Sequence, residues 1–313
     1  MDRALTETRS TCCYCGTGCG VIIESIDERI VGVRGDPAHP ANYGRLCSKG
    51  ATLHLACVQT GRAAVPLLRS ERDQPQSPTS WDHALEVAAQ RFSSIIEAHG
   101  PDAVAFYISG QLLTEDYYLF NKLARALIGT NNIDSNSRLC MSSAVAAYKT
   151  TLGSDAVPCS YADIELADLM LLAGTNTAFA HPVLFRRIEA ARENNPDLKL
   201  IVVDPRRTDT AACADLHLAL TPGSDALLYS AMLHVMLWEG LTDNAFIAEH
   251  TEGFNALRTQ LAEFTPGTVA GSCGLKADDI VLAARMFGAA KAPLSFWCQG
   301  LNQSIHGTGN GAA

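Results

Sequence analysis

The stretch TCCYCGTGCG at residues 11–20 is the most informative part of the sequence, together with YGRLCSKG at residues 43–50. Their cysteines have the spacing C-x2-C-x3-C-x27-C, formed by Cys12, Cys15, Cys19 and Cys47. Three closely spaced thiolates can bind three corners of an iron–sulfur cube, and one distant cysteine can complete the fourth. The interleaved glycines allow the backbone to curl around such a cluster. This spacing therefore predicts a [4Fe–4S] cluster.

A structural zinc site is the alternative metal centre for these cysteines. Zinc sites use paired C-x2-C knuckles or Cys/His pairs, whereas Cys47 has no paired cysteine nearby. Cys13 also lies inside the first stretch, but only Cys12 gives the x2 and x3 intervals, so we do not expect Cys13 to be a ligand. The segment around these cysteines is poor in core-forming residues, and we expect it to need the cluster as a staple.

The composition is that of a compact globular protein, because 47% of the 313 residues are hydrophobic and 18% are charged. A net charge of −9 disfavours a nucleic-acid partner, which would require clustered Lys and Arg. We expect no membrane partner, since every apolar run is far shorter than a bilayer span. The first ten residues, MDRALTETRS, resemble no export signal, so we expect a cytoplasmic protein. Thiols stay reduced there, and the eleven cysteines then indicate metal binding rather than disulfides.

From Trp81 onward, helical and strand-like patterns alternate. Residues 69–80 are polar and contain two prolines, which is typical of a linker, and Thr79 or Ser80 is placed to cap a helix that begins at Trp81. We expect strands at 103–108, 169–173, 200–203, 215–220 and 294–297, and helices at 114–128, 182–194, 225–238 and 277–289. Apolar strands that alternate with amphipathic helices predict parallel, doubly wound α/β sheets. The glycine-rich run at 307–311 is expected to form a turn.

Polar or glycine-rich patches follow several of these strands. They lie at Ser109–Gln111, Gly174–Asn176, Asp204–Thr208, Gly223–Asp225 and Gly300–Gln303. Ligands of parallel sheets bind at the carboxyl ends of strands, so these patches are candidate binding loops. Each patch taken singly also fits an ordinary turn between a strand and a helix.

The two cysteine-containing stretches resemble the N-terminal segment of the molybdopterin bis-guanine-dinucleotide oxidoreductases, a family that includes nitrate reductases, formate dehydrogenases and dimethyl-sulfoxide reductases. The resemblance implies a small N-terminal iron–sulfur domain followed by parallel, doubly wound α/β domains. It also implies a [4Fe–4S] cluster and molybdenum-bis(molybdopterin guanine dinucleotide) as cofactors. Lys49 stands two residues after the fourth cysteine, and in this family that lysine bridges cluster and pterin in electron transfer.

On this basis we expect three parts, the last of them truncated. Residues 1–68 would form the [4Fe–4S] domain. Residues 69–150 would be the first part of a discontinuous α/β pterin-binding domain that carries the molybdenum ligand. Residues 151–313 would form a second α/β domain, similar to dinucleotide-binding domains and incomplete at its C-terminal end.

Cys140 lies in the run RLCMSSAV, just before a helix expected from about Ser142. Taken alone, such a cysteine is usually a small buried apolar residue. The run, however, resembles the molybdenum-ligand segment of cytoplasmic and periplasmic nitrate reductases. Formate dehydrogenases typically have His after this position, where this chain has Met141. The resemblance therefore implies that Cys140 is the molybdenum ligand and favours nitrate over formate.

The same resemblance assigns the strand-end patches to the pterin cofactor. Besides Lys49, the implied contacts are Gln111, Asn136, Gly174, Thr175, Asn176, Asp204, Pro205, Arg206, Thr208, Gly223, Asp225, Gln299 and Gln303. Acidic residues among them are expected at guanine and ribose, and the glycine-rich loops near phosphate. This assignment rests on the order in which all of these residues occur along the chain, and not on any single loop.

The implied function is that of the catalytic subunit of an assimilatory nitrate reductase. It would reduce nitrate to nitrite with electrons from a donor protein, which could be an NADH-linked flavoprotein, ferredoxin or flavodoxin. Formate dehydrogenase of the same family is one alternative, and a non-catalytic iron–sulfur electron-transfer subunit is another. Since the resemblance covers less than half of a typical family member, we expect the 313-residue chain alone to be inactive.

Overall fold

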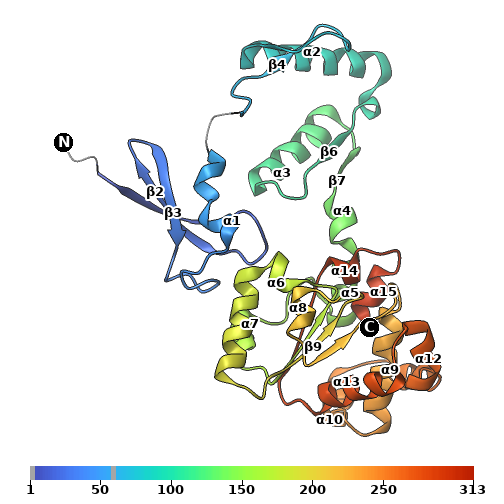
Figure 1. Ribbon diagram of the computed structural model, residues 1–313. Coiled ribbons are helices and arrows are strands. Elements are labelled where there is room, and N and C mark those ends of the chain that lie inside the picture. The colour runs from blue at the N-terminus through green and yellow to red at the C-terminus, as the bar shows by residue number, and fades with distance from the viewer. Residues whose placement is uncertain (1–3, 58–60) are drawn as a thin grey trace. The chain divides into compact units, whose positions relative to one another are not determined.

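The computed structural model describes residues 4–57 and 61–313 and divides into two compact units (Figure 1). Unit 1 comprises residues 1–56 and 143–313, and unit 2 comprises residues 57–142.

Unit 1 begins with a three-stranded antiparallel sheet in the order β1-β2-β3. These strands are β1 (Thr6–Thr11), β2 (Gly20–Ile26) and β3 (Arg29–Gly35), and the short helices α1 (Ser48–Ala51) and η1 (Leu53–Cys57) follow. Among the described residues up to Cys57, the buried hydrophobic side chains are only Cys19, Val21, Ile22 and Ala41. So small a core supports the expectation that this segment needs a further staple.

The larger part of unit 1 is built on a four-stranded parallel sheet in the order β10-β9-β8-β11. The strands are β8 (Leu169–Ala173), β9 (Lys199–Val203), β10 (Leu216–Leu218) and β11 (Pro293–Trp297). Each lies within two residues of the range expected from the sequence. The helices α7 (Pro182–Asn194), α9 (Asp225–Trp238) and α13 (Ala277–Ala289) match their expected ranges. The parallel, doubly wound α/β class is therefore confirmed.

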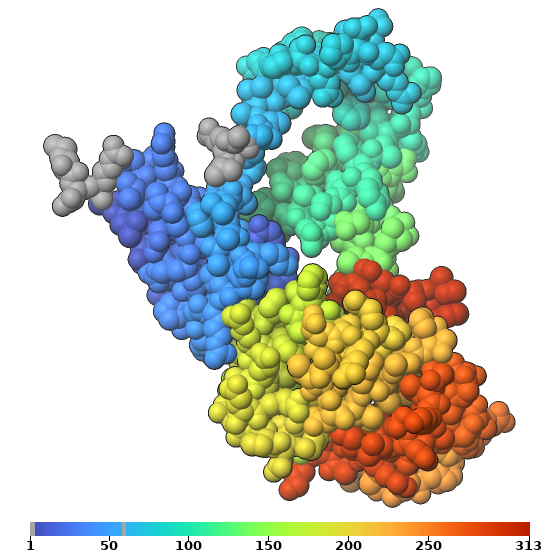
Figure 2. Space-filling view, viewed as in Figure 1, coloured from blue at the N-terminus to red at the C-terminus, as the bar shows by residue number. Residues whose placement is uncertain are grey.

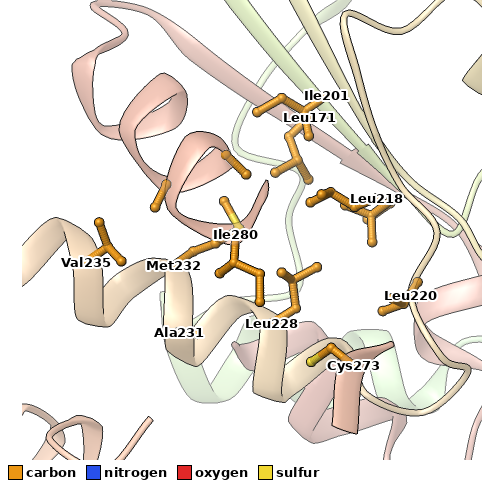
Figure 3. Close-up of a cluster of buried hydrophobic side chains, with 14 of the residues drawn as sticks. Leu171, Ile201, Leu218, Leu220, Leu228, Ala231, Met232, Val235, Cys273 and Ile280 are labelled. Carbon is orange, nitrogen blue, oxygen red and sulfur yellow. The ribbon is translucent and has the colours of Figure 1, made fainter. Parts of the chain in front are cut away.

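Helices cover both faces of this sheet because both sets of alternating side chains are apolar. On one face Leu171, Ile201 and Leu218 pack against α9, α13 and α12 (Pro266–Cys273), as Figure 3 shows for part of this cluster. On the other face Met170 and Leu172 pack against the apolar side of α7. Fully burying a Leu or Ile side chain stabilises the fold by about 1.5–3 kcal/mol, so these two layers dominate the stability of unit 1.

Short helices follow the carboxyl ends of the strands and shape the loops there. They are α6 (Thr177–Ala180), α8 (Asp209–Ala212), α14 (Gln299–Asn302) and α15 (Gly307–Ala312). A further short helix, η4 (Tyr161–Glu165), precedes β8. The helix α5 (Ser142–Leu152) leads from unit 2 into unit 1 and begins where the sequence predicts. Among residues 4–57 and 61–313, no helix combines the length and apolarity needed to cross a bilayer.

Unit 2 contains a hairpin, a long helix and a two-stranded parallel sheet. Its elements are β4 (Leu67–Leu68), β5 (Ser77–Pro78), α2 (Trp81–His99), η2 (Pro101–Ala103), β6 (Phe106–Ile108), α3 (Thr114–Asn121), the π-helical turn η3 (Lys122–Ile128), β7 (Ile133–Ser135) and α4 (Ser137–Cys140). Ser80 caps α2, because its hydroxyl accepts a hydrogen bond from the His83 backbone at 3.2 Å. The capping prediction is thus confirmed for Ser80.

Two local predictions are wrong, and one helical region was not predicted. The expected linker at 69–80 contains β5, which pairs with β4. The glycine-rich run at 307–311 forms the helix α15 instead of a turn, since the missing side chain of Gly307 lets its backbone approach that of Asn302 and the Asn310 amide bonds the Leu301 carbonyl at 3.2 Å. Residues 244–273 contain α10 (Asn244–His250), α11 (Phe254–Leu261) and α12, of which the sequence analysis predicted none.

Candidate functional site

The loop between β1 and β2 carries three of the predicted cluster cysteines. The Cys12 backbone N–H donates to the Cys19 carbonyl at 2.8 Å, which closes the loop at its base. Gly18 has φ +64°, a left-handed conformation that favours glycine, and its N–H donates to the Cys15 carbonyl at 3.2 Å. The sequence folds locally as a tight turn that presents several thiols on one side.

All four predicted ligands line one small cavity. Its walls are formed by Cys12, Tyr14, Cys15, Thr17, Cys19, Leu46, Cys47, Gly50, Pro182 and Val183. Cys13 is exposed and does not line this cavity. The structure therefore brings the four spaced thiols together and leaves Cys13 outside.

The thiols in this cavity perturb one another. Burial raises the pKa of Cys19 to about 11, and the nearby Cys15, Cys12 and Cys47 thiols add to that rise. Burial also raises the pKa of Cys12. Burial and mutual repulsion thus disfavour free thiolates here, and the positive charge of a bound iron–sulfur cluster would offset both effects. Within residues 4–57 and 61–313, no group of three or more His, Cys, Asp or Glu side chains is placed to hold a single metal ion.

Lys49 lies on α1, two residues after Cys47, and is exposed. Its ammonium is 5.9 Å from the centre of the Tyr14 ring. The pKa of His181 is lowered by burial and, to a smaller extent, by the charge of Lys49. His181 directly precedes Pro182, a wall of the cysteine cavity. Lys49 therefore lies beside the Tyr14 ring of the cysteine segment.

The loops after β8 and β11 cross in direct backbone contact. The Gly300 N–H donates to the Gly174 carbonyl at 3.1 Å, and the Gly174 N–H donates to the Val203 carbonyl at 2.9 Å. Gly174 has φ +57°, and a Cβ at either glycine would lie 2.6 Å from a backbone atom of the other loop. Only glycine fits at this crossing, which positions Thr175, Asn176 and the exposed Gln299 and Gln303 at the sheet edge.

The loop after β9 is tied to the loop after β8. The Thr210 hydroxyl donates to the Asn176 side chain at 2.9 Å, and the buried Thr208 caps α8 through the Ala211 N–H at 3.2 Å. The Asp204 carboxylate accepts the Arg206 N–H at 2.9 Å. Several of the predicted contact residues thus shape the loops through internal hydrogen bonds. Pro205 and Arg206 remain exposed at the edge.

The turn before α9 places an acid at a helix N-terminus. Gly223 has φ +88° with open space around it, and Asp225 is the first residue of α9. Asp225 is buried, and this burial raises its pKa. The structure thus places the Gly223–Asp225 segment at the same edge of the sheet as the other predicted loops of unit 1.

Unit 2 holds the remaining predicted residues. Gln111 follows β6 and Asn136 follows β7, and these strands are parallel, so both residues lie at one edge. The Asn136 side chain accepts a hydrogen bond from the Gly110 N–H, and its carbonyl accepts the Cys140 N–H at 2.9 Å. Cys140 is partly exposed and is the last residue of α4, and it lies just before α5, which begins at Ser142 as expected.

Three residues that organise the cysteine segment were missed in the sequence. They are Asn42, Tyr161 and Arg187. Asn42 bonds the Gly20 N–H and the Gly20 and Arg45 carbonyls, at 2.8–3.0 Å. A signal for Arg187 was available, because it stands among the buried apolar positions Leu184, Ile188 and Ala191 of α7.

Most of the chain matches two known protein-family models. Residues 62–312 match the molybdopterin oxidoreductase family, and residues 5–57 match the molybdopterin oxidoreductase Fe4S4 domain. Similar curated relatives include a nitrate reductase of Klebsiella oxytoca, 48% identical over 97% of this chain and 34% of the relative, and one of Synechocystis, 42% identical over 98% and 44%. A formate dehydrogenase subunit of Methanococcus maripaludis is 38% identical over 96% and 43%.

Among solved structures, acetylene hydratase from Pelobacter acetylenicus matches with a TM-score of 0.82 and 26% identity, over 97% of this chain and 41% of that chain. The chain spans about a third to under half of the length of the curated relatives named above. The matched families cover nearly all of the described residues, including the four-thiol cavity and the sheet-edge loops. The chain therefore belongs to the molybdopterin oxidoreductase family and carries that family's Fe4S4 domain in its N-terminal segment.

Proposed function

We propose that this chain is part of the catalytic subunit of a molybdenum nitrate reductase. The observation that carries the proposal is the run Arg138–Met141, in which Met follows the candidate ligand Cys140, in a chain that is 42–48% identical to nitrate reductases. When bound, the molybdenum–pterin group supplies the two-electron chemistry that takes one oxygen from nitrate and leaves nitrite.

The chain's own residues would bind and connect the two cofactors. We propose Cys12, Cys15, Cys19 and Cys47 as the cluster ligands, because they share one cavity. Lys49 would order the path between cluster and pterin, since its cation lies beside both the cysteine segment and His181. Cys140 would ligate molybdenum through its thiolate, a soft donor suited to such a centre.

The sheet-edge loops would bind the pterin in its bis(guanine dinucleotide) form. The proposed contacts are Lys49, Gln111, Asn136, Gly174, Thr175, Asn176, Asp204, Pro205, Arg206, Thr208, Gly223, Asp225, Gln299 and Gln303. The crossing of Gly174 and Gly300 fixes the loops after β8 and β11 against each other, which would hold the proposed contact residues of both loops in place. The open turn at Gly223 offers helix N–H groups to a phosphate, with Asp225 as an acceptor for guanine N–H groups.

We also propose the domain division expected from the sequence. Residues 1–68 would form the cluster domain, residues 69–150 the first part of a discontinuous domain carrying Cys140, and residues 151–313 a second α/β domain. The sparse burial within unit 2 supports a discontinuous domain, because such a domain completes its core with another chain segment. We propose further that residues 1–313 alone do not reduce nitrate, since the chain spans only 34% and 44% of two nitrate reductase relatives.

The assimilatory role, the cytoplasm and a soluble electron donor belong to the same proposal. The four proposed cluster ligands must stay reduced to bind iron, which suits a reducing compartment. An NADH-linked flavoprotein, ferredoxin or flavodoxin would deliver electrons to the cluster. A periplasmic nitrate reductase of Desulfovibrio desulfuricans is 41% identical over 98% of this chain, so cell fractionation is the test of the compartment.

Formate dehydrogenase is the second candidate, because an F420-dependent formate dehydrogenase subunit is 38% identical over 96% of this chain. A non-catalytic electron-transfer subunit is a third, and the presence of Cys140 together with the loop set disfavours it. One experiment separates all three. The holoenzyme is assayed for nitrate reduction with reduced viologen and for formate oxidation with oxidised viologen. Its molybdenum content is measured in the same preparation.

We expect molybdenum and nitrate reduction in the parent, and Cys140→Ser should abolish turnover while the iron content is retained. Cys159→Ser is the matched control, since Cys159 is also a partly exposed thiol but lies outside the proposed ligands. Formate oxidation without nitrate reduction would favour the second candidate. Absence of molybdenum from a fully iron-loaded protein would favour the third.

A further inference from the structure

We propose that Arg187 is a positioning residue that fixes both cysteine-bearing loops on α7 and places a permanent positive charge beside the cluster. The inference rests on the proposed function only in requiring a bound [4Fe–4S] cluster. Every residue involved lies in unit 1, where the N-terminal segment abuts α7 (Figure 2).

Arg187 is a buried cation with little ionic compensation. Its side chain is 5% exposed, and its ion-pair partner Glu165, at 3.1 Å, is 62% exposed. Burying a charge is costly unless its hydrogen bonds are satisfied. Here the guanidinium donates chiefly to backbone carbonyls: Nη1 bonds Pro40 at 2.8 Å, and Nη2 bonds Tyr161 at 3.2 Å. The carbonyls hold the cation in place without neutralising it, and Nε is buried with no acceptor among the described residues. Because the Glu165 carboxylate is largely exposed to solvent, it screens only part of the positive charge.

These bonds connect Arg187 to the segment that precedes Cys47. Pro40 and Ala41 accept from Nη1, and the next residue, Asn42, is 1% exposed. Asn42 bonds the N–H and C=O of Gly20, the neighbour of Cys19, and also the Arg45 carbonyl two residues before Cys47. A shift of Arg187 would therefore be transmitted to both sides of the cavity.

A second connection runs through Tyr161. Its hydroxyl donates to the Gly16 carbonyl at 3.1 Å, inside the loop between Cys15 and Cys19. The guanidinium of Arg187 lies 5.7 Å from the Tyr161 ring centre and 5.3 Å from that of Tyr43. Burial raises the pKa of Tyr161, and the Cys15 and Cys19 thiols raise it further, which independently locates this ring beside the ligands. A chain of contacts thus links the Arg187 guanidinium, the Tyr161 ring and the loop that carries Cys15 and Cys19.

This arrangement has an electrostatic consequence. Reduction adds one negative charge to the cluster, and a nearby cation with low solvent exposure stabilises the reduced state. Removing the charge of Arg187 should therefore lower the midpoint potential of the cluster. Lys would keep the charge but would lose the planar fork that reaches two carbonyl groups at once.

The test uses the holoenzyme purified without oxygen, with iron and sulfide analysis, electron paramagnetic resonance and a redox titration of the cluster. The variants are Arg187→Gln, Arg187→Lys and Tyr161→Phe. Arg192→Gln is the matched control, because Arg192 lies on the same helix and pairs with Asp215 away from the cysteine loops.

We expect Arg187→Gln to shift the oxidised-to-reduced equilibrium by about tenfold, which is about 59 mV lower for a one-electron couple. Arg187→Lys and Tyr161→Phe should give smaller shifts, with altered resonance line shapes, and Arg192→Gln should match the parent. Parental potentials and spectra in all three variants would overturn the proposal. If the Arg187→Gln variant loses its iron, the Arg187→Lys and Tyr161→Phe variants are used instead. Parental potentials and spectra in both of them would overturn the proposal. A parent without iron would instead contradict the proposed function.

Discussion

The helices α7 of unit 1 and α2 of unit 2 are both amphipathic, yet they differ in what they bury. Six of the residues in α7 are buried, including Leu184, Phe185 and Ile188. No residue of the longer α2 is buried, and Trp81 and Leu85 on its apolar stripe are 65% and 61% exposed. The difference arises because α7 covers a four-stranded sheet, whereas the sheet of unit 2 has two strands of three residues each.

Helical periodicity therefore predicts a helix, but not the surface against which its apolar face packs. Among the described residues of unit 2, Val104 and Ala124 are the only buried hydrophobic side chains. A two-stranded sheet is marginal by itself and needs further packing. We therefore expect the stability of unit 1 to come from contacts among its own residues, and the stability of unit 2 to depend on contacts beyond its own residues. Four sets of substitutions test this difference between the units.

The largest effect is expected at the cysteine cavity of unit 1. Cys47→Ser removes one of four thiols that share the cavity, and we expect loss of essentially all cluster iron together with rapid proteolysis of residues 11–57. Iron and sulfide analysis with limited proteolysis measures both. Cys13→Ser in unit 1 and Cys140→Ser in unit 2 should keep their iron. Iron loss in Cys13→Ser would show that the ligand register is wrong.

A core truncation should separate the two units next. Ile201 of β9 is fully buried between the sheet of unit 1 and its covering helices, so Ile201→Ala should lower the free energy of unfolding by about 2–5 kcal/mol. Leu85→Ala on the exposed face of α2 should change it by no more than about 0.5 kcal/mol. Urea unfolding combined with amide hydrogen exchange reports each unit separately. An equal cost at Leu85 in the holoenzyme would show that this face is covered there.

Two glycines with positive φ offer a finer comparison. A Cβ at Gly174 would lie 2.6 Å from the Leu301 nitrogen, whereas Gly129 of unit 2 has open space. Gly129→Ala should cost roughly 1–2 kcal/mol from left-handed backbone strain. Gly174→Ala should cost clearly more, because the loops after β8 and β11 must also separate. Thermal unfolding of both variants measures this difference. Equal costs would mean that the loops after β8 and β11 can separate with little loss of stability.

The smallest effects concern two acids. In unit 1, hydrogen bonds from the Lys291 and Ala292 N–H groups lower the pKa of Asp168. A depressed folded-state pKa gives stability that is present above the unfolded value, about 3.9, and is lost as the pH falls through the folded value. Asp168→Asn should therefore destabilise at pH 7 and lose that effect in acid.

In unit 2, Arg138 lowers the pKa of Asp134, but this pair is fully exposed and salt screens it. Asp134→Asn should leave the unfolding midpoint unchanged at moderate salt. Urea midpoints measured from pH 3 to pH 7 for both variants decide the matter. A pH-independent deficit in Asp168→Asn would mean that its charge is not responsible.

Much of unit 1 could be predicted because its signals are local. Strands such as Leu169–Ala173 are continuous apolar runs, and helices such as Pro182–Asn194 begin at a proline and keep an apolar stripe. The cysteine spacing predicted four thiols in one place and excluded Cys13, and the structure shows that arrangement. These features depend on residues close together in the sequence, or on a spacing with few geometric solutions.

The rest depends on tertiary contacts that no local pattern encodes. The run at 307–311 is helical because Asn310 is buried and its side chain bonds the Leu301 carbonyl. Arg187 is buried because carbonyls of residues about 146 positions earlier meet it. The helices of residues 244–273 are short, and two of them, α11 and α12, pack against α9, a contact that is not visible from a local pattern.

The position of β11 in the chain has a consequence for biosynthesis. β11 pairs with β8, although Asp168 and Ala292 at their starts are 124 positions apart. At roughly 5–20 residues per second, about 6–25 seconds pass between the two strands leaving the ribosome. During that interval β9 can pair with β8 on one side, but the opposite side of β8 has no strand to bond. Nascent chains should therefore pass through a state with an open apolar strand edge, where a holding chaperone would have most to protect.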